Sequence, residues 1–432
     1  MRERSRPRRS PRGDGCPRDE GHARGEDRPR SEGHARGEDR PRSESRPRSE
    51  SRSRGVAPFR DLLRHPVVVA VGGYVAVRLL MLAAIVVTEH ARGGHAAGRL
   101  TKADGYWYLL IAGHGYGHPP PIGPDGAYTH KTPLAFFPLY PWLIRAVSDV
   151  GIPKLYAALL LTGLCGTLAA ALVTLWARAY VGDRGAVVLT TVWSLLPTSV
   201  VLDMAYSEAL FVAAAAGTLL ALQRRQLVVT GLACTVAGLT RPTAAGLVLG
   251  VLIAVALDVR RTRLTIRHVA AALLAPAGLL ISLGHVAAVT GRVDGWFWLE
   301  RTVWHSGFDG GWSWLRAVGQ LVAGGPARHQ PPIVMSVVVV IAFVAAFAVW
   351  LRRRPPAAEL AYTTIAGVLA IGERNFVHVK PRFLLVAFPV LVPLARRLSR
   401  WSTPTLLWLA LPTLAASIAW NTYLVVVWPK SV

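Results

Sequence analysis

Apolar runs separated by short polar connectors make up most of the chain from residue 66 to its C-terminus. The first run, residues 67–87, is about 21 residues long, which at about 1.5 Å per helical residue matches a hydrocarbon core of roughly 30 Å. Ten further apolar runs follow it, at residues 154–176, 186–203, 208–222, 227–240, 243–257, 268–290, 332–351, 357–372, 381–396 and 404–427. The pattern predicts an all-α polytopic bundle of about eleven transmembrane helices, formed by residues 56–432.

A long segment, residues 88–153, separates the first two runs and does not read as a simple connector. Its apolar part, residues 134–150, is interrupted by Pro138 and Pro141, which predicts a re-entrant or interfacial piece rather than a span. Loops of this length are usually functional or disordered, and this one is too aromatic for disorder. We therefore expect an active-site loop here.

Alternate connectors are rich in arginine, and this asymmetry predicts the orientation of the chain. Positive residues favour the cytosolic side of a membrane, so these connectors and the N-terminus are expected in the cytosol. The same alternation places Asp104, Asp203, Glu208, Arg241, a Trp-rich loop at 291–331 and the run 373–382 on the extracytoplasmic side. The arginines of the cytosolic connectors are Arg178, Arg184, Arg224, Arg225, Arg260, Arg261, Arg263, Arg267, Arg352, Arg353, Arg354, Arg396, Arg397 and Arg400.

Residues 1–55 are polar throughout and contain a tandem twelve-residue repeat, GHARGEDRPRSE, at Gly21–Glu32 and Gly33–Glu44. A repeat without a hydrophobic face cannot stack into a solenoid, so we predict a disordered cytosolic tail. The tail lacks the apolar stretch of a signal peptide. It is either a dispensable extension or a segment that touches anionic lipid.

Composition narrows the function further. An apolar fraction of 52% suits one polytopic membrane domain better than several soluble domains. The net charge of +24 comes largely from the tail and the connectors, so nucleic acid is not an expected partner. Three scattered cysteines imply no disulfide framework. The five histidines in or near the first loop match no ligand spacing, and we expect neither a metal nor a cofactor.

Three motifs resemble those of PIG-V-type mannosyltransferases, which are integral-membrane enzymes of the GT-C class. The first reads Asp104-x-x-Trp107-Tyr108 and is followed by FFPLYP at 136–141; the second is AYSEALF at 205–211; the third runs from Arg382 to Pro389. The chain departs from the family pattern just before Asp104, at Lys102, and again at Arg241. The resemblance implies a GT-C-like fold with a long extracytoplasmic first loop, a polyprenyl-phosphate-linked sugar donor, and mannose as the sugar.

Asp104 is the candidate catalytic base. Sugar transfer to a hydroxyl needs a group that takes the acceptor's proton while the leaving phosphate is stabilised. Asp104 also precedes a helical run, where aspartate commonly caps the helix N-terminus. The motif favours catalysis, and both roles are compatible.

Seven further residues are candidates for substrate binding, each with an alternative. The aromatic Trp107, Tyr108 and their neighbours suit stacking on sugar or an interfacial belt. Glu208 could bind hydroxyl groups or pair with Arg241. The cations could bind the donor phosphate or be compensated by Glu373. The Trp-rich loop suits a carbohydrate-binding surface or an interfacial helix. The seven candidates are Trp107, Tyr108, Tyr206, Glu208, Arg241, Lys380 and Arg382.

The leading hypothesis is a multi-pass glycosyltransferase of the cytoplasmic membrane that moves a hexose, mannose by the resemblance, to a lipid, glycan or protein acceptor. The alternative is a transporter or lipid flippase using the same charges. Transporters often contain internal repeats, and no second copy of the Asp104 or FFPLYP stretch occurs. A non-catalytic membrane subunit is a third possibility.

Overall fold

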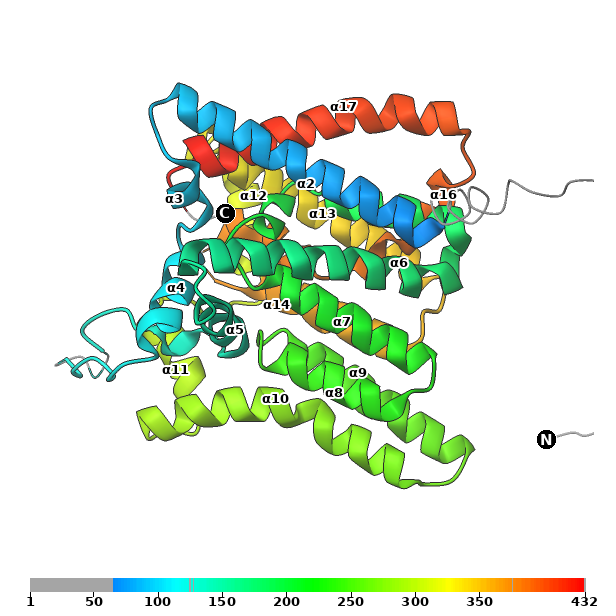
Figure 1. The fold of residues 1–432 in the computed structure, drawn as a ribbon, viewed down its shortest axis with the longest axis horizontal. Coiled ribbons are helices and arrows are strands. Elements are labelled where there is room, and N and C mark those ends of the chain that lie inside the picture. Colours follow the sequence, from blue (N-terminus) through cyan, green and yellow to red (C-terminus); the bar gives the residue numbers. More distant parts are fainter. Residues whose placement is uncertain (1–64, 124–125, 127, 375, 431–432) are drawn as a thin grey trace, which may run out of the picture. The chain divides into compact units, whose positions relative to one another are not determined.

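A computed structural model describes residues 65–430 apart from 124, 125, 127 and 375, and the predicted tail lies outside these residues. Within them every regular element is a helix, so the predicted all-α fold is confirmed (Figure 1). The α-helices are α2 Pro66–Ala91, α3 Ala96–Leu100, α4 Asp104–His114, α5 Leu139–Ser148, α6 Lys154–Ser194, α7 Glu208–Gln223, α8 Leu227–Gly238, α9 Ala244–Arg261, α10 Ile266–Thr290, α11 Gly295–Thr302, α12 Trp312–Val322, α13 Pro331–Leu351, α14 Ala357–Gly372, α15 Lys380–Leu384, α16 Val392–Leu398 and α17 Thr403–Thr422. Short 3₁₀ turns and a π-helix are η1 Pro133–Ala135, η2 Ser199–Leu202, η3 Pro326–His329, η4 Val377–Val379, η5 Phe388–Leu391 and η6 Tyr423–Val427.

The helix lengths agree with a multi-pass membrane protein. Among the described residues five helices are long and apolar enough to cross a bilayer, namely α2, α6, α10, α13 and α17 with η6. Residues 377–398 form a sixth candidate, bent by 76° between Leu384 and Phe388. Helices α7, α8 and α14 are apolar but shorter. Every predicted apolar run contains a helix, whereas the count of about eleven spans stays a prediction.

The long helix α6 contains a break that the sequence pattern placed correctly. Gly182 has φ 68° and ψ −179°, a conformation that glycine adopts without the steric cost of a Cβ atom. The break lies between the predicted runs 154–176 and 186–203. It is held by an ion pair between Arg178 and Asp183 at 2.6 Å.

Small residues allow the shorter helices to pack closely. A Cβ atom on Gly278 of α10 would lie 1.9 Å from the carbonyl oxygen of Thr235 on α8, and one on Gly250 of α9 would lie 2.6 Å from that of Ala358 on α14. Only glycine permits these approaches. Close contact between small residues is how helices associate where lipid removes the usual hydrophobic driving force.

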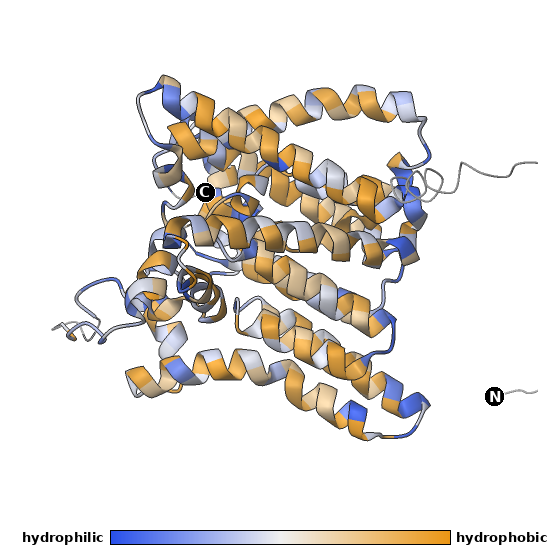
Figure 2. Ribbon diagram, viewed as in Figure 1, coloured by the Kyte–Doolittle hydropathy of each residue, from blue (hydrophilic) through white to orange (hydrophobic). Residues whose placement is uncertain are grey.

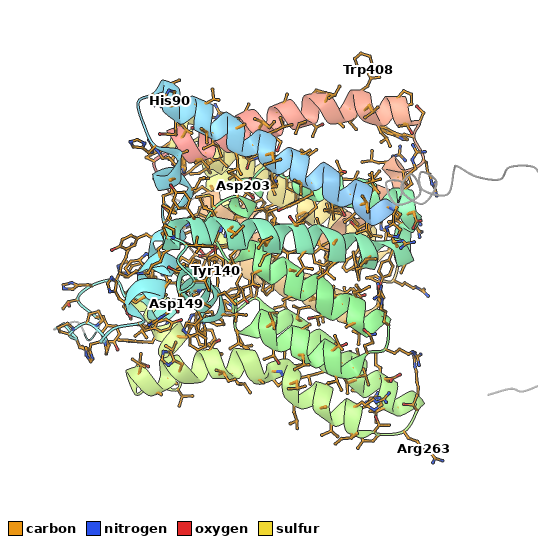
Figure 3. The ribbon with its side chains drawn as sticks, viewed as in Figure 1. His90, Tyr140, Asp149, Asp203, Arg263 and Trp408 are labelled. Atoms are coloured by element: carbon orange, nitrogen blue, oxygen red, sulfur yellow. The ribbon has the colours of Figure 1, made fainter. Side chains whose placement is uncertain are left out.

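The arginine-rich connectors meet at one end of the bundle, which we call the basic end. Arg396 donates to the carbonyl of Tyr180 at 2.7 Å, and Arg184 donates to that of Trp401 at 2.6 Å, so connectors more than 200 residues apart are neighbours. Figure 2 shows hydrophilic residues gathered at the ends of the helices and apolar residues along them. Trp408 projects outward from α17 (Figure 3).

At the opposite end, which we call the site end, not all helices are long. Helix α8 has 12 residues, so it is about 18 Å long, well short of a bilayer core. The turn from α8 to α9, which carries Arg241, is therefore set deeper than the ends of the longer helices. Helices α4 and α5 of the first loop pack against each other and against α6 at this end.

Candidate active site

Four charged side chains from distant parts of the chain meet at the site end and form what we call the charged cluster. Arg382 donates to Oδ2 of Asp104 and to Oε1 of Glu208, and Arg241 lies 2.8 Å from the same Glu208 oxygen. Asp104 and Glu208 are the first residues of α4 and α7, Arg241 lies in the α8–α9 turn, and Arg382 is in α15. The structure thus brings four of the predicted site residues into contact.

The charged cluster is buried on one side and open on the other. The side chain of Glu208 is 0% exposed and that of Arg382 is 2% exposed, whereas Arg241 is 12% and Asp104 28% exposed. Two cations balance two carboxylates, which is the condition under which buried charges are tolerated. Oε2 of Glu208 and Nε of Arg241 have no hydrogen-bond partner among the described residues. Asp104 and Arg241 are therefore the more exposed members of the charged cluster, and Glu208 and Arg382 lie behind them.

Tyr206, Ser207 and Tyr108 form a polar layer beneath the charged cluster. The guanidinium carbon of Arg382 lies 4.3 Å from the centre of the Tyr206 ring, a cation–π contact. The Ser207 hydroxyl is 2.8 Å from the Tyr108 hydroxyl and receives a bond from Arg241 at 3.1 Å. Tyr108 and Tyr206 are buried. They support the charged cluster from below instead of presenting their rings to a substrate.

Asp104 itself does not cap its helix. The N-cap residue of α4 is Ala103, no side chain caps this helix, and the carboxylate of Asp104 turns to Arg382. The capping alternative is therefore wrong. Ala103 has φ 56°, an unfavourable conformation for an alanine, and such strain commonly occurs at functional sites. The strained turn aims the carboxylate into the charged cluster.

Lys102 ties this turn to the C-terminal π-helix. Its ammonium donates to the carbonyls of Leu424, Val425 and Trp428 at 2.9, 3.1 and 3.2 Å, while its own carbonyl accepts the Tyr206 hydroxyl at 3.2 Å. A π-helix leaves carbonyls that need partners, and Lys102 supplies them. In the sequence, Lys102 was recognisable only as a departure from a family pattern.

Replacing Lys102 by methionine is expected to loosen the C-terminal segment. Methionine keeps the length of the side chain and removes the three donors, leaving carbonyls unsatisfied at a cost of about 1–3 kcal/mol. Carboxypeptidase digestion should release residues after Tyr423 faster than in the unmodified chain. Lys131→Met, which alters a lysine over the Trp304 ring, is the matched control and should leave the digestion rate unchanged.

Aromatic side chains form a wall beside Asp104. Trp107 stacks on Phe136 with ring centres 6.1 Å apart, and Trp304 meets both edge-on at 5.3 and 5.4 Å. Trp296 donates to the carbonyl of Ala135 at 3.1 Å, so the Trp-rich loop packs on the first loop. Trp107, which is partly exposed, is the predicted aromatic residue that can still contact a substrate.

A pair of carboxyl groups near Asp104 was not anticipated from the sequence. Burial, reinforced by the charge of Glu373, raises the pKa of Glu300 to about 8, and burial raises the pKa of Glu373 to about 7. Ser306 donates to Glu373 at 3.2 Å. The backbone joins the same segments, because Arg374 N–H donates to Gly307 at 2.6 Å. These protonatable acids link the Trp-rich loop to the end of α14.

We expect stability to depend on pH through Glu300. A carboxyl whose pKa is raised on folding contributes stability that is complete below its ordinary pKa near 4.5 and is lost as pH rises through about 8. The melting temperature should fall by a few degrees between pH 5 and 8.5. Glu300→Gln, which is neutral at every pH, should show a smaller fall. If the melting temperatures of the two proteins fell equally with pH, ionisation of Glu300 would not be the cause of the fall.

Two predicted residues occupy positions different from those expected. Lys380 is buried and donates to the carbonyls of Ala370, Ile371 and Glu373 at 3.3, 2.8 and 2.7 Å, so it caps α14 and its ammonium is not presented for phosphate. Glu208 pairs with Arg241, which was one of its two predicted roles. Because its side chain is buried, it does not contact a substrate directly. Lysine at a helix C-terminus satisfies the last carbonyls.

Asp203 has a partner inside the bundle that the sequence analysis overlooked. It forms an ion pair at 2.9 Å with Arg78 of α2, which also donates to the carbonyl of Ser199 at 2.6 Å. The labelled Asp203 lies among the helices in Figure 3. An arginine in the middle of an apolar run is costly unless it is paired. The position of Arg78 in the first run therefore indicated that an acidic partner exists. The pair joins α2 to the end of η2. No group of three or more His, Cys, Asp and Glu within the described ranges is arranged to hold a metal ion.

Comparisons with known proteins find similarity to solved structures alone. No family model and no curated protein matches it. ArnT from Cupriavidus metallidurans, bound to undecaprenyl phosphate, is similar with a TM-score of 0.47 and 16% identity over 79% of this chain and 62% of that one. The apo oligosaccharyltransferase from Archaeoglobus fulgidus gives 0.46 and 15% over 82% of this chain and 56% of that one. The chain therefore spans less than two thirds of either protein.

Proposed function

We propose that the chain is a GT-C-type glycosyltransferase that moves a hexose from a polyprenyl-phosphate donor to a hydroxyl acceptor, with Asp104 as general base. The observation that carries the proposal is the charged cluster: a partly exposed carboxylate fixed by Arg382 next to an accessible Arg241, under an aromatic wall. Mannose as the hexose rests on the motif resemblance alone.

The groups suit an inverting displacement. The acceptor oxygen attacks the anomeric carbon, its proton passes to the Asp104 carboxylate, and the bond from that carbon to the phosphate oxygen breaks with its electron pair going to the phosphate. Arg241 supports this step because an arginine guanidinium can donate two bonds to a phosphate and its side chain is 12% exposed. Arg382 holds the Asp104 carboxylate in orientation. Trp107 supplies a ring face for sugar.

The position of the charged cluster supports a lipid-linked donor. It lies at the end opposite the arginine connectors, and if those connectors face the cytosol then the site faces outward, where nucleotide sugars are absent. We therefore place the reaction on the extracytoplasmic side of the cytoplasmic membrane. The acceptor is a lipid, glycan or protein that carries a free hydroxyl group.

Transfer from a labelled donor tests the proposal. Membranes containing the chain, incubated with radiolabelled polyprenyl-phosphomannose, should form labelled product that membranes with Asp104→Asn do not form. Movement of the labelled lipid between leaflets without new product would instead identify a transporter. If the membranes showed no product and no lipid movement, both functions would be contradicted, and a non-catalytic subunit would remain.

A further inference from the structure

A cavity lies at the basic end, remote from the charged cluster. Its volume is about 460 Å³, within the range of pockets that hold small ligands. It is lined by residues of five helices: α6 near its break, the C-terminal parts of α7 and α9, and the N-termini of α8 and α14. We call it the basic-end pocket.

The basic-end pocket is lined by charges of both signs. Arg225 and Arg261 are exposed, and neither forms an ion pair within the described part of the chain. Glu359 is buried and accepts the Tyr180 hydroxyl at 2.6 Å, whereas the Asp258 side chain is 30% exposed and lies 3.1 Å from His268. The lining thus offers two unpaired cations, one buried acid and one partly exposed acid.

The remaining wall is apolar and continues onto the outer surface of the helices. Leu222, Leu227 and Ala254 line the pocket, and Leu257, also in the lining, is itself exposed. Val229 on the next turn of α8 is exposed as well. In a membrane protein such surface contacts acyl chains, so the pocket opens where the headgroup and chain regions of a leaflet meet.

We propose that the basic-end pocket binds an aminophospholipid, whose headgroup carries a phosphate and a primary ammonium. The phosphate would lie between Arg225 and Arg261, and the ammonium would face Asp258 and Glu359. Two cations and two acids make the lining neutral overall, which complements a zwitterion better than an anionic headgroup. Arginine at headgroup depth is a common phosphate contact.

The backbone at Arg225 supports a functional reason for this residue. Arg225 follows α7 with φ 55°, and the bonds Gln226 N–H to Ala221 and Arg225 N–H to Leu222, at 2.9 and 3.0 Å, define a Schellman turn. Glycine normally occupies this left-handed position. The backbone of an arginine is strained in this conformation. Such strain often occurs at functional positions, and this supports a role of the Arg225 side chain.

Lipid binding by the purified, delipidated chain tests the proposal without any enzymatic assay. Native mass spectrometry should show phosphatidylethanolamine bound at least tenfold more tightly than phosphatidylcholine, whose methylated ammonium cannot donate hydrogen bonds, and than phosphatidylglycerol, which has no ammonium. Equal binding of the three lipids, or preference for phosphatidylglycerol, would overturn the assignment.

Two variants locate the site. Arg225→Gly removes the guanidinium and fits the left-handed turn, so it should fold with an unchanged or higher melting temperature while phosphatidylethanolamine binding falls at least tenfold. Arg261→Gln should weaken binding similarly. Arg263→Ala is the control, because Arg263 lies in the same connector, points outward in Figure 3 and is not part of the lining. Binding unaffected by both pocket variants would overturn the site.

Discussion

Replacing Asp104 by asparagine is expected to lower the rate of sugar transfer at least a hundredfold while the chain stays folded. A positioned general base typically contributes about 10²–10⁴ in rate, and asparagine keeps the shape of the side chain but cannot take the acceptor's proton. Because Asp104 is partly exposed and its partner Arg382 still pairs with Glu208, the loss of charge should cost little stability. Transfer from labelled donor, with the melting temperature as a folding check, measures both effects.

The matched control is Asp149→Asn, a change of the same kind at the exposed end of α5 (Figure 3). It should leave transfer unchanged. If Asp104→Asn retained full activity in this assay, Asp104 would not be the base, and the charged cluster would have to act by binding alone.

Replacing Arg382 by methionine is expected to produce the largest loss of stability in the chain. It leaves Glu208 buried beside Arg241 alone and Asp104 without its partner, and breaking a buried ion pair costs about 3–5 kcal/mol. Thermal unfolding in detergent should show a fall of several degrees in melting temperature. Arg400→Met, an exposed arginine at the basic end, should show almost none.

A double variant separates stability from function at this position. Removing Glu208 and Arg382 together, as Glu208→Gln with Arg382→Met, eliminates one buried charge of each sign and should restore much of the lost stability. Transfer should remain lost, because Asp104 is no longer held in orientation. A double variant as unstable as Arg382→Met would show that the ion pair is not the source of the effect.

Much of the fold could be predicted because it depends on local composition. Apolar runs predicted the helices, and alternating arginines predicted which connectors meet at one end. Gly182 is a case where a run boundary matched a break inside a continuous helix. The number of spans could not be settled in the same way, because α7, α8 and α14 are apolar but shorter than a bilayer core.

The candidate site was predictable only in part. Asp104, Glu208, Arg241 and Arg382 carried signals in motif or topology, and they do meet. Roles that depend on packing were not visible. The capping of α14 by Lys380 and the burial of Tyr108 follow from tertiary contacts and not from spacing.

Groups absent from the motifs were missed for the same reason. Glu300 and Glu373 lie 73 residues apart, and although the sequence offered Glu373 as a partner for the nearby cations, no pattern linked it to Glu300. Arg78 and Asp203 are separated by 125 residues, although a lone arginine in an apolar run should have prompted a search for an acid.

The most direct test of the whole proposal is an experimental structure of the chain with polyprenyl phosphate. We expect density for the phosphate within hydrogen-bonding distance, about 3 Å, of the Arg241 guanidinium and on the side of the charged cluster that Asp104 faces. Phosphate density found only at sites beyond reach of Asp104 would contradict a glycosyl-transfer site at the charged cluster.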